Sequence, residues 1–345
     1  MNQIDYKTAG VNIDAGNLIV KRITKVVKNT HNKNVINNIG GFASLFNLKE
    51  IISEYKNPIL VQSIDGIGTK SIIARMMNKY DTIGIDLVSA CCNDISVMAA
   101  KPLTILDYIA NDRLKPEIIE EVIHGLAKSC KKHNIALVGG EIAEMPDIYQ
   151  KNEVDLVGII TGIVDKDKII DGTKIKNDNV VIGLPSSGLQ TNGYSLARKL
   201  LFDIAKYKID DDIQGLNKNI GETLLEPAYI YNQYIQLLLD NKITINGMAH
   251  ISGGGMVDNI PRILPKGCSV KIFLNSWPIL EIFKVLKDIG NINQNEMFRT
   301  FNMGIGLVII VQKTEVEKIK SLLANKIDIY VIGKVITGNR KVILA

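Results

Sequence analysis

The sequence lacks the features that mark membrane, secreted and disulfide-stabilised proteins. No apolar run reaches the roughly 18 to 20 residues that a bilayer-spanning helix needs, so we expect no membrane partner. The first residues lack the apolar core of a secretory signal, which favours a cytoplasmic protein. The 4 cysteines show no C-x-x-C spacing and lie in apolar segments, as reduced core residues do.

A concentrated positive surface is also missing. The formal net charge is +5, but the lysines are scattered among acids, and no arginine-rich arm carries interleaved aromatic residues. We therefore expect no nucleic-acid partner. A composition of 46% apolar and 22% charged residues is globular, and 345 residues favour two domains. The charged stretch 165–179 is the natural boundary, which predicts domains at 1–168 and 169–345.

No conventional P-loop occurs, yet one stretch has the composition of a phosphate site. The residues from Pro58 to Ile64 favour a strand, and Asp65 should lie at its carboxyl end, where ligands often bind in α/β sheets. Gly66 and Gly68 would let the backbone approach phosphate oxygens, Lys70 would neutralise phosphate charge, and Asp65 could hold magnesium. From the pattern alone, a phosphate site and an ordinary strand-turn-helix corner stay equally open.

Two further segments carry acids that could also hold a cation. A strand from Ile135 should end in two glycines and Glu141, so Asp65 and Glu141 could meet at one sheet edge and share a cation. In the helix expected at 82–99, Asp94 lies about 80° round from Asp86. A buried carboxylate needs a partner or a cation. Solvent exposure, a helix cap or a surface turn is the alternative for these acids.

Glycine-rich turns recur elsewhere in the chain. Gly40 and Gly41 form either a phosphate turn or a connector. The loop 185–193 precedes a helix near Tyr194, and such loops either bind anions through backbone N–H groups or serve as turns. His250 precedes three consecutive glycines and could handle a proton, contact a ligand or be a satisfied core residue. Other periodicities predict helices at 15–27, 116–133, 223–240 and 278–289, and strands at 103–110, 154–164, 180–184, 304–311, 327–335 and 341–345.

Six segments taken together resemble one enzyme family. They are D-G-I-G-T-K, G-I-D-L-V…C-N-D, L-V-G-G-E-I-A-E-M-P, S-S-G-L-x-x-N-G-Y-S-L, A-H-I-S-G-G-G and M-F-R-T-F-N-M-G-I-G. Their order and spacing from Tyr6 onward are similar to those of phosphoribosylformylglycinamidine cyclo-ligase, also called aminoimidazole ribonucleotide synthetase. The resemblance implies an enzyme of purine biosynthesis that uses ATP and Mg²⁺ to close the imidazole ring of formylglycinamidine ribonucleotide. It also implies two α/β domains of the α+β type and a homodimer in which the mixed N-terminal sheets pair.

The same resemblance assigns roles by position in the motifs. It implies magnesium ligands at Asp65, Asp94 and Glu141, with Asp86 as a further candidate, and it places Lys70 and Thr69 against the nucleotide phosphates. Lys70 and His250 are the catalytic candidates. The glycine-rich turns and the residues expected to face the cleft are the binding candidates: Gly40, Gly41, Gly66, Gly68, Thr69, Ser187, Gly188, Asn192, Gly253, Gly254, Gly255, Arg299 and Asn302.

One position departs from the family pattern. Many members carry histidine in the S-S-G-L-H-S-N-G loop, where this chain has Gln190. An amide cannot exchange a proton near neutral pH, so His250 becomes the better candidate for proton transfer.

Two rival interpretations stay open at this point. Thiamine-phosphate kinase, selenophosphate synthetase and the larger formylglycinamidine synthetase share some of these acids, although no reactive cysteine precedes Cys91 as selenophosphate synthesis would need. A nucleotide-sensing or nucleic-acid-binding module without catalysis would show no turnover and, with nucleic acid, a salt-dependent affinity.

Overall fold

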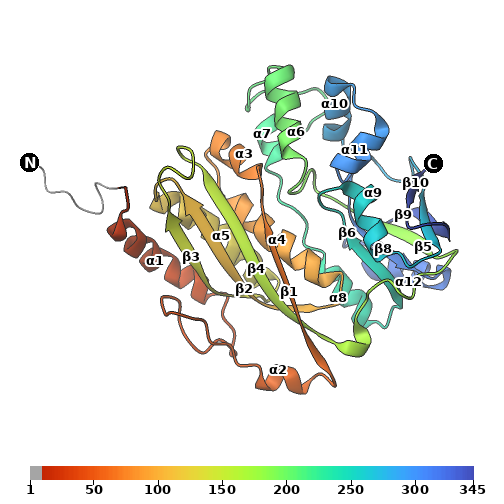
Figure 1. Ribbon diagram of the computed structural model, residues 1–345, viewed down its shortest axis with the longest axis horizontal. Helices are drawn as coiled ribbons and strands as arrows, with labels where there is room; N and C mark the ends of the chain where they lie inside the picture. The colour runs from red at the N-terminus through yellow and green to blue at the C-terminus, as the bar shows by residue number, and fades with distance from the viewer. Residues whose placement is uncertain (1–9) are drawn as a thin grey trace, which may run out of the picture. The chain divides into compact units, whose positions relative to one another are not determined.

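The computed structural model describes residues 10–345, and this part of the chain divides into two compact units (Figure 1). The first unit runs to Ile95 and resumes from Lys101 to Lys166. The second contains Ser96–Ala100 and Asp167–Ala345. Within residues 10–345, no helix is both long and apolar enough to cross a membrane.

The first unit contains one mixed sheet in its described residues. The strand order is β1-β4-β2-β3; β2 and β3 are parallel, and the other neighbours are antiparallel. The strands are β1 (Pro58–Gly66), β2 (Lys101–Asn111), β3 (Ala136–Glu144) and β4 (Val154–Asp165). The helices are α1 (Ile13–Lys28), α2 (Lys49–Ser53), α3 (Lys70–Met77), α4 (Asp81–Ser96) and α5 (Pro116–Lys132). A short 3₁₀ turn, η1 (Lys166–Lys168), lies where the chain passes into the second unit.

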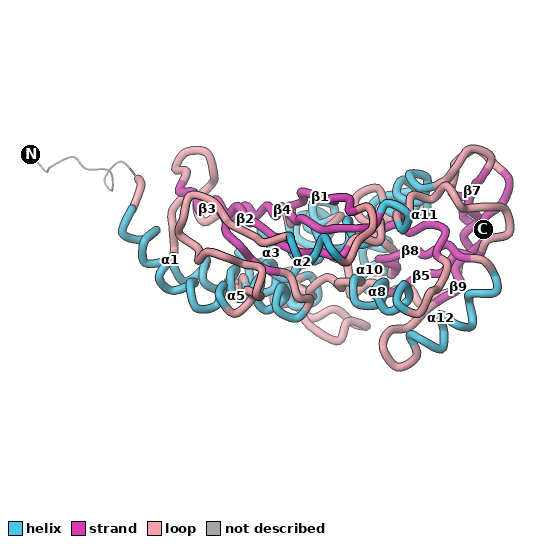
Figure 2. The backbone as a smooth tube through the Cα atoms, turned by 90° about the horizontal axis from the view of Figure 1, so that it is seen from below, coloured by secondary structure: helices cyan, strands magenta, loops and turns pink. Residues whose placement is uncertain are grey.

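Helices cover one face of this sheet and leave the other open. Seen edge-on, α1 and α5 lie on the same side of the strands (Figure 2). On that side, a Cβ at Gly158 would lie 2.9 Å from Cys91 Sγ, so glycine in β4 lets α4 approach closely. On the open side Leu60 and Ile64 of β1 are exposed, as the two-residue alternation of a half-covered strand requires.

The second unit is built on a larger mixed sheet with the strand order β10-β7-β9-β5-β8-β6. Its β10 and β7 are parallel, and its other neighbours are antiparallel. The strands are β5 (Val180–Pro185), β6 (Ile245–His250), β7 (Cys268–Ile272), β8 (Ile305–Val311), β9 (Tyr330–Thr337) and β10 (Val342–Leu344).

Helices α8 and α12 pack on one face of this sheet. Their apolar residues join those of β5, β6 and β8 in one buried core, in which every residue of β8 is buried. The helices of the unit are α6 (Tyr194–Arg198), α7 (Ile220–Leu224), α8 (Asn232–Asp240), α9 (Gly255–Asn259), α10 (Glu281–Gly290), α11 (Gln294–Thr300) and α12 (Val316–Leu323). A π-helical turn η2 (Lys199–Ile204) and 3₁₀ turns η3 (Ile260–Ile263) and η4 (Lys313–Glu315) complete it.

The expected α/β class with a mixed first sheet is confirmed, but two element predictions are wrong. The helix predicted at 223–240 is two helices, because Pro227 separates α7 from α8 and proline disfavours helix at the residue before it. The strand predicted to end at Glu141 continues as β3 to Glu144. Only glycine fits the ladder at position 140, because a Cβ there would lie 2.4 Å from the Asp107 side chain on β2.

Candidate functional site

In the second unit, the segment from α11 to β8 brings two glycine-rich loops together. The Phe301 ring lies against the first loop, where a Cβ at Gly193 would be 2.4 Å from ring atom Cε1. The carbonyl of Phe298 lies over the second loop, 2.1 Å from where a Cβ at Gly255 would be. Both glycines have positive φ, 81° and 58°, so close approach and backbone conformation both require glycine here.

Asn302 ties the first loop to the turn before β8. Its Nδ2 donates to the carbonyl of Gly188 at 2.8 Å, and its Oδ1 accepts from the Ser186 hydroxyl at 2.8 Å and from the Gly304 N–H at 2.9 Å. The side chain is only 4% exposed. Asn302 therefore holds the shape of the loop that carries the candidates Ser187 and Gly188.

The second loop, Ser252–Gly255, is held from behind by Asn259 of α9. Asn259 Oδ1 accepts from the Ser252 N–H at 2.6 Å, and Asn259 Nδ2 donates to the carbonyl of Gly253 at 3.0 Å. Asn192 of the first loop lies across from it, with Oδ1 3.2 Å from where a Cβ at Gly253 would be. The loops that carry the candidate turns at Ser187–Gly188 and Gly253–Gly254 therefore lie next to each other, with Asn192 of the first beside Gly253 of the second.

Arg299 and His250 lie at the ends of the elements that form this cluster. Arg299, on α11, is exposed, and its Nε lies 3.7 Å from Asp258 Oδ2 of α9. His250 ends β6 directly before the second loop and pairs in register with Leu307 of β8. The sequence missed Asp258, which carries the negative charge next to Arg299, because a single acid on a short helix gives no signal of its own.

Gln190 belongs to a chain of hydrogen bonds that stabilises the first loop. Its Nε2 donates to the Tyr231 hydroxyl at 2.9 Å, and that hydroxyl donates to the carbonyl of Pro185 at 2.8 Å. Both side chains are buried, and Gln190 has a positive φ of 61°. Burial raises the pKa of Tyr231, so its hydroxyl stays protonated and remains a donor.

In the first unit, Asp65 and Asp94 lie close to the same thiol. The Ser63 hydroxyl donates to Asp94 Oδ2 at 3.3 Å, and the Asp65 carboxylate accepts from the Gly66 N–H at 2.7 Å. Burial, with the nearby charges of Asp65 and then Asp94, raises the pKa of Cys91 to about 12. Asp65 is the penultimate residue of β1, which confirms its expected place at the carboxyl end of a strand.

Lys70 and Asp86 form a fully buried ion pair. The Lys70 Nζ lies 2.7 Å from Asp86 Oδ2, and both side chains are 0% exposed. Lys70 begins α3 and Asp86 lies on α4, so the pair joins two helices of the first unit. This contact accounts for a carboxylate on an otherwise apolar helix face. The proposed roles of Lys70 at a phosphate and of Asp86 at a metal stay predictions.

β1 and β3 run in the same direction, so Asp65 and Glu141 lie at the same end of the sheet, as expected. The two acids do not meet within one chain, however, so the expectation that they share a cation there is wrong. β1 and β3 are opposite edge strands, and three strand spacings separate them by roughly 14 Å. The register aligns Asp65 with Gly158, Asp107 and Gly140, which places the next residue, Glu141, on the other face of the sheet. The physical reason is topological, because β4 and β2 lie between the two strands.

The remaining candidates lie in turns of the first unit. Gly40 has a φ of 95° and Gly68 a φ of 55°, so both turns use the left-handed region that suits glycine. Around Gly40 and Gly41, Asn37 donates to the carbonyl of Ala43 and accepts from the Leu45 N–H, each at 2.7 Å. The Asn37 side chain therefore holds this loop in a defined turn. Gly66 and Thr69 flank the corner between β1 and α3.

The donor set of Asp65 and Asp94 fits magnesium. Within residues 10–345, no three His, Cys, Asp or Glu side chains gather in a way that could hold a metal. Magnesium in nucleotide sites takes one or two carboxylates and completes its shell with water and phosphate oxygens, so two acids are enough. Carboxylate oxygens are also the hard donors that this cation prefers.

Two family models match the chain in order. One is described as AIR synthase related protein, N-terminal domain, and matches residues 51–164; the other is the C-terminal domain of the same description and matches residues 176–345. The fold and these two matches define a two-domain protein of the AIR synthase related class.

Curated relatives identify the family within this class. The phosphoribosylformylglycinamidine cyclo-ligase of Thermoanaerobacter pseudethanolicus is 49% identical over 342 residues, which cover 99% of this chain and 100% of the relative. That of Carboxydothermus hydrogenoformans is 46% identical over 345 residues, covering 100% and 99%. The chain therefore belongs to the phosphoribosylformylglycinamidine cyclo-ligase family, and the resemblance seen in its motifs is confirmed.

Solved structures with low identity share the fold. A thiamine-monophosphate kinase from Stenotrophomonas maltophilia is 14% identical with a TM-score of 0.69, covering 94% of this chain and 95% of that chain. The hydrogenase maturation protein HypE of E. coli is 16% identical with a TM-score of 0.68, covering 96% and 94%. These likenesses concern the fold alone.

Proposed function

We propose that the protein is an ATP-dependent cyclo-ligase of purine biosynthesis. It converts formylglycinamidine ribonucleotide into 5-aminoimidazole ribonucleotide, ADP and phosphate. The observation that carries this proposal is the 49% identity over the whole length of a curated cyclo-ligase. A solved structure of the same fold, at 15% identity and a TM-score of 0.66, is a HypE in complex with ATP, which is consistent with a nucleotide substrate. Its cytoplasmic location stays a prediction.

The chemistry explains why ATP is needed. The formamide oxygen is a poor leaving group, so the γ-phosphoryl group of ATP is first transferred to it. The amidine nitrogen then attacks the activated carbon, and a C–N bond forms as the C–O bond breaks and phosphate leaves. The formamide nitrogen gives up one proton as its oxygen is phosphorylated, and the attacking nitrogen gives up a second, which needs an acceptor. His250 is the candidate acceptor, since Gln190 cannot take a proton and is bonded to Tyr231.

The cluster in the second unit suits phosphate groups of the substrates. Turns at Ser187–Gly188 and Gly253–Gly254 can turn backbone N–H groups towards an anion, and glycine permits the close approach. Arg299 adds an exposed guanidinium, the side chain best suited to phosphate. Asn302 and Asn259 position the two turns, and Asn192 lies beside the second. Gly40, Gly41, Gly66, Gly68, Thr69 and Lys70 are the corresponding candidates in the first unit.

We assign magnesium to Asp65 and Asp94. Asp65 and Asp94 would supply carboxylate ligands to the cation, while the Ser63 hydroxyl orients Asp94 from β1. Bound there, magnesium would neutralise charge on the phosphates of ATP. Asp86 is the weaker candidate because it already faces Lys70.

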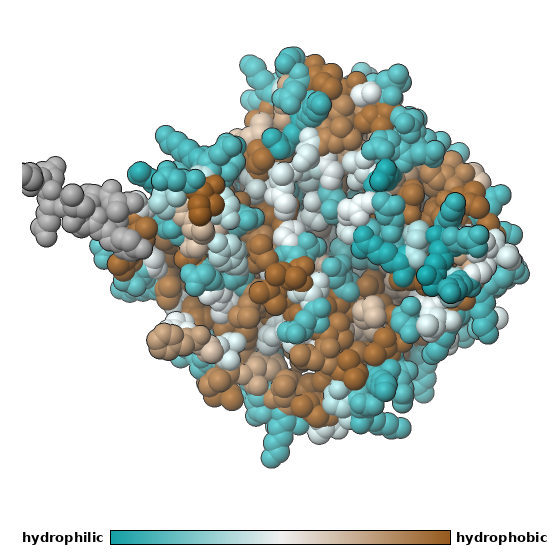
Figure 3. Space-filling view, in the orientation of Figure 1, coloured by the Kyte–Doolittle hydropathy of each residue, from teal (hydrophilic) through white to brown (hydrophobic). Residues whose placement is uncertain are grey.

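The proposed homodimer would resolve the position of Glu141. Glu141 shares the open face of the sheet with Ile64, Ile159 and Leu106, which lie in neighbouring register and are exposed by 66%, 36% and 36%. In the space-filling view, apolar surface lies over β1 and β4 (Figure 3). A second copy on this face would cover that surface. Any site that uses both Asp65 and Glu141 must then combine two chains.

Turnover with the three predicted components tests the function. We expect ADP and a diazotisable aminoimidazole to form in equal amounts when the folded protein meets ATP, magnesium and formylglycinamidine ribonucleotide. ADP should not accumulate when the ribonucleotide is left out. A folded protein that forms no aminoimidazole under these conditions would overturn the proposal.

A further inference from the structure

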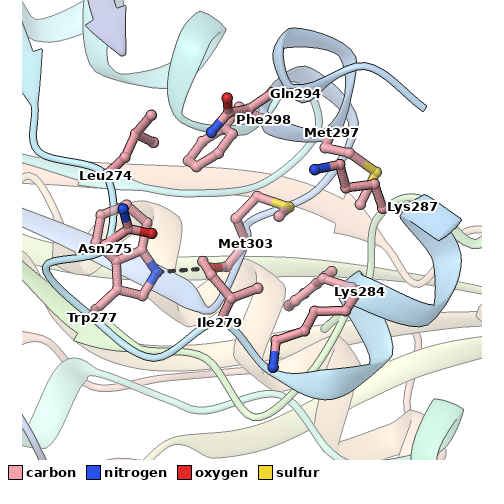
Figure 4. Close-up of a pocket in the computed structure, with 11 residues that line it drawn as sticks. Leu274, Asn275, Trp277, Ile279, Lys284, Lys287, Gln294, Met297, Phe298 and Met303 are labelled. Atoms are coloured by element: carbon pink, nitrogen blue, oxygen red, sulfur yellow. Dashed lines mark hydrogen bonds between the residues drawn. The ribbon is translucent and has the colours of Figure 1, made fainter. Parts of the chain in front are cut away.

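Trp277 makes a hydrogen bond to the turn before β8. Its indole Nε1 donates to the carbonyl of Met303 at 2.8 Å, and Figure 4 shows this bond at the wall of a pocket. Both residues are buried, with exposures of 5% and 6%. The pocket has a volume of about 190 Å³ and is lined by residues such as Leu274, Met297 and Phe298.

The turn that receives this bond is conformationally strained. Met303 has a φ of 50°, in the left-handed region that side chains other than glycine and asparagine seldom adopt. A residue other than glycine keeps this left-handed conformation only when the surrounding structure holds it. The Asn302 side chain fixes the N-terminal side of the turn through Ser186 and Gly188. The indole N–H of Trp277 fixes its other side.

We propose that Trp277 is a positioning residue for the reaction. Through the Met303 carbonyl it keeps Asn302 in place, and through Asn302 it keeps the Ser186–Gly188 loop in the shape that binds the substrate phosphate. Trp277 touches neither substrate, so its effect passes entirely through the turn. The inference rests on the proposed function of that loop.

The hydrogen bond from Trp277 to the Met303 carbonyl, more than the packing of the indole ring, positions the turn. Trp277 meets Phe298 edge to face, with ring centroids 6.2 Å apart, and its neighbourhood includes open pocket space. Loss of the N–H would leave a buried carbonyl without its donor and allow Met303 to relax towards an ordinary φ. Asn302 would move with it, and the substrate loop would lose its support.

The sequence permits an exchange of a single atom to test this. Trp277 is the only tryptophan in the chain, so biosynthetic replacement by benzothienylalanine changes one N–H into sulfur at one position. Replacement by 5-fluorotryptophan keeps the N–H and is the matched control. We expect the sulfur protein to show about a tenfold higher KM for the ribonucleotide, with a smaller change in kcat, because positioning is lost and the chemistry is not.

The outcomes separate this inference from the function on which it rests. If the wild-type protein does not turn over the ribonucleotide, the proposed function fails. If the fluorotryptophan protein turns over and the sulfur protein has the same KM, the positioning role is overturned. A lower melting temperature with unchanged KM would also contradict it, because that is the effect of a purely structural residue.

Two substitutions give an independent check by mutation. Trp277→Phe removes the donor and keeps an aromatic ring, whereas Leu274→Ala removes apolar surface from the same pocket and leaves the bond intact. The KM should rise in Trp277→Phe and stay near the wild-type value in Leu274→Ala. Equal KM changes in the two variants would show that packing, not the hydrogen bond, positions the loop.

Discussion

At the scale of single residues, burial decides what an acid or a lysine can do. Lys70 and Asp86 were singled out by the sequence as possible phosphate and metal contacts, and the structure places them against each other with no exposed surface. Breaking such a pair by removing one charge leaves the other charge buried and is far more costly than losing a surface pair.

Asp86→Asn should therefore act mainly on stability. We expect the free energy of unfolding to fall by about 3 kcal/mol, since the Lys70 ammonium would remain buried opposite a neutral amide. Urea unfolding of the variant measures this. A metal role would give a different result, namely near-normal stability with a raised magnesium requirement, and that outcome would contradict our interpretation.

Asp107 gives a pH dependence with a definite sign. Burial raises the pKa of this carboxyl from 3.8 to about 7. Between these values the folded chain holds a proton that the unfolded chain has lost, so stability falls as pH rises from about 4 to about 7. Asp107→Asn removes this titration and should stabilise the protein at about pH 8 by on the order of 2 kcal/mol, with little gain at about pH 4.

Melting curves of the two proteins at several pH values check this prediction. The difference in melting temperature between the Asp107→Asn variant and the wild type should widen as pH rises. An equal difference at all pH values would mean that Asp107 titrates at its ordinary pKa in the folded state.

At the scale of elements, two helices of the first unit cross in near contact through glycine. A Cβ at Gly125 of α5 would lie 1.8 Å from the carbonyl oxygen of Asp81 at the start of α4. A Cβ at Gly84 of α4 would lie 2.1 Å from the carbonyl oxygen of Val122. The two backbones thus leave no room for a side chain at either position.

Gly125→Ala should force α4 and α5 apart and destabilise the protein by about 2 kcal/mol or more. Gly16→Ala is the matched control, because Gly16 also lies in a helix and its Cβ would have no neighbour closer than 4.0 Å. There alanine should stabilise by about 0.5–1 kcal/mol through helix propensity. Chemical denaturation of both variants gives the comparison, and a Gly125→Ala protein of normal stability would contradict the predicted clash.

The sequence predicted the elements wherever local patterning decides them. β1 follows from a run of residues that favour strands, and α5 follows from helical spacing with an initial proline. The break at Pro227 was missed because the flanking apolar residues keep a helical period on both sides. The length of β3 was missed because pairing with β2 outweighs the turn preference of Gly139 and Gly140.

The glycine-rich turns among the candidate residues could be predicted from the sequence, but the hydrogen bonds and the strand order that position the candidates could not. The motifs around Gly188, Gly253 and Asn302 could be found because glycine, hydroxyl and amide residues cluster in them. The bond from Trp277 to the Met303 carbonyl has no signal in the sequence, since any residue offers a carbonyl. The separation of Asp65 and Glu141 depends on strand order, which local patterns do not specify.

At the scale of the whole molecule, the proposed dimer predicts complementation between inactive variants. Asp65→Asn and Glu141→Gln should each abolish magnesium-ATP use while the fold is kept. If one site takes Asp65 from one chain and Glu141 from the other, a mixed dimer has one intact site. Refolding equal amounts together should restore about a quarter of wild-type turnover. A mixture that stays inactive although mixed dimers form would contradict a shared site.

The central claim is that ATP activates the formamide oxygen of the ribonucleotide. The most direct measurement uses formylglycinamidine ribonucleotide labelled with ¹⁸O at that oxygen and follows the label in the released phosphate by mass spectrometry. The account predicts one ¹⁸O in each phosphate formed along with the aminoimidazole product. Unlabelled phosphate, released by attack of water on ATP, would contradict it.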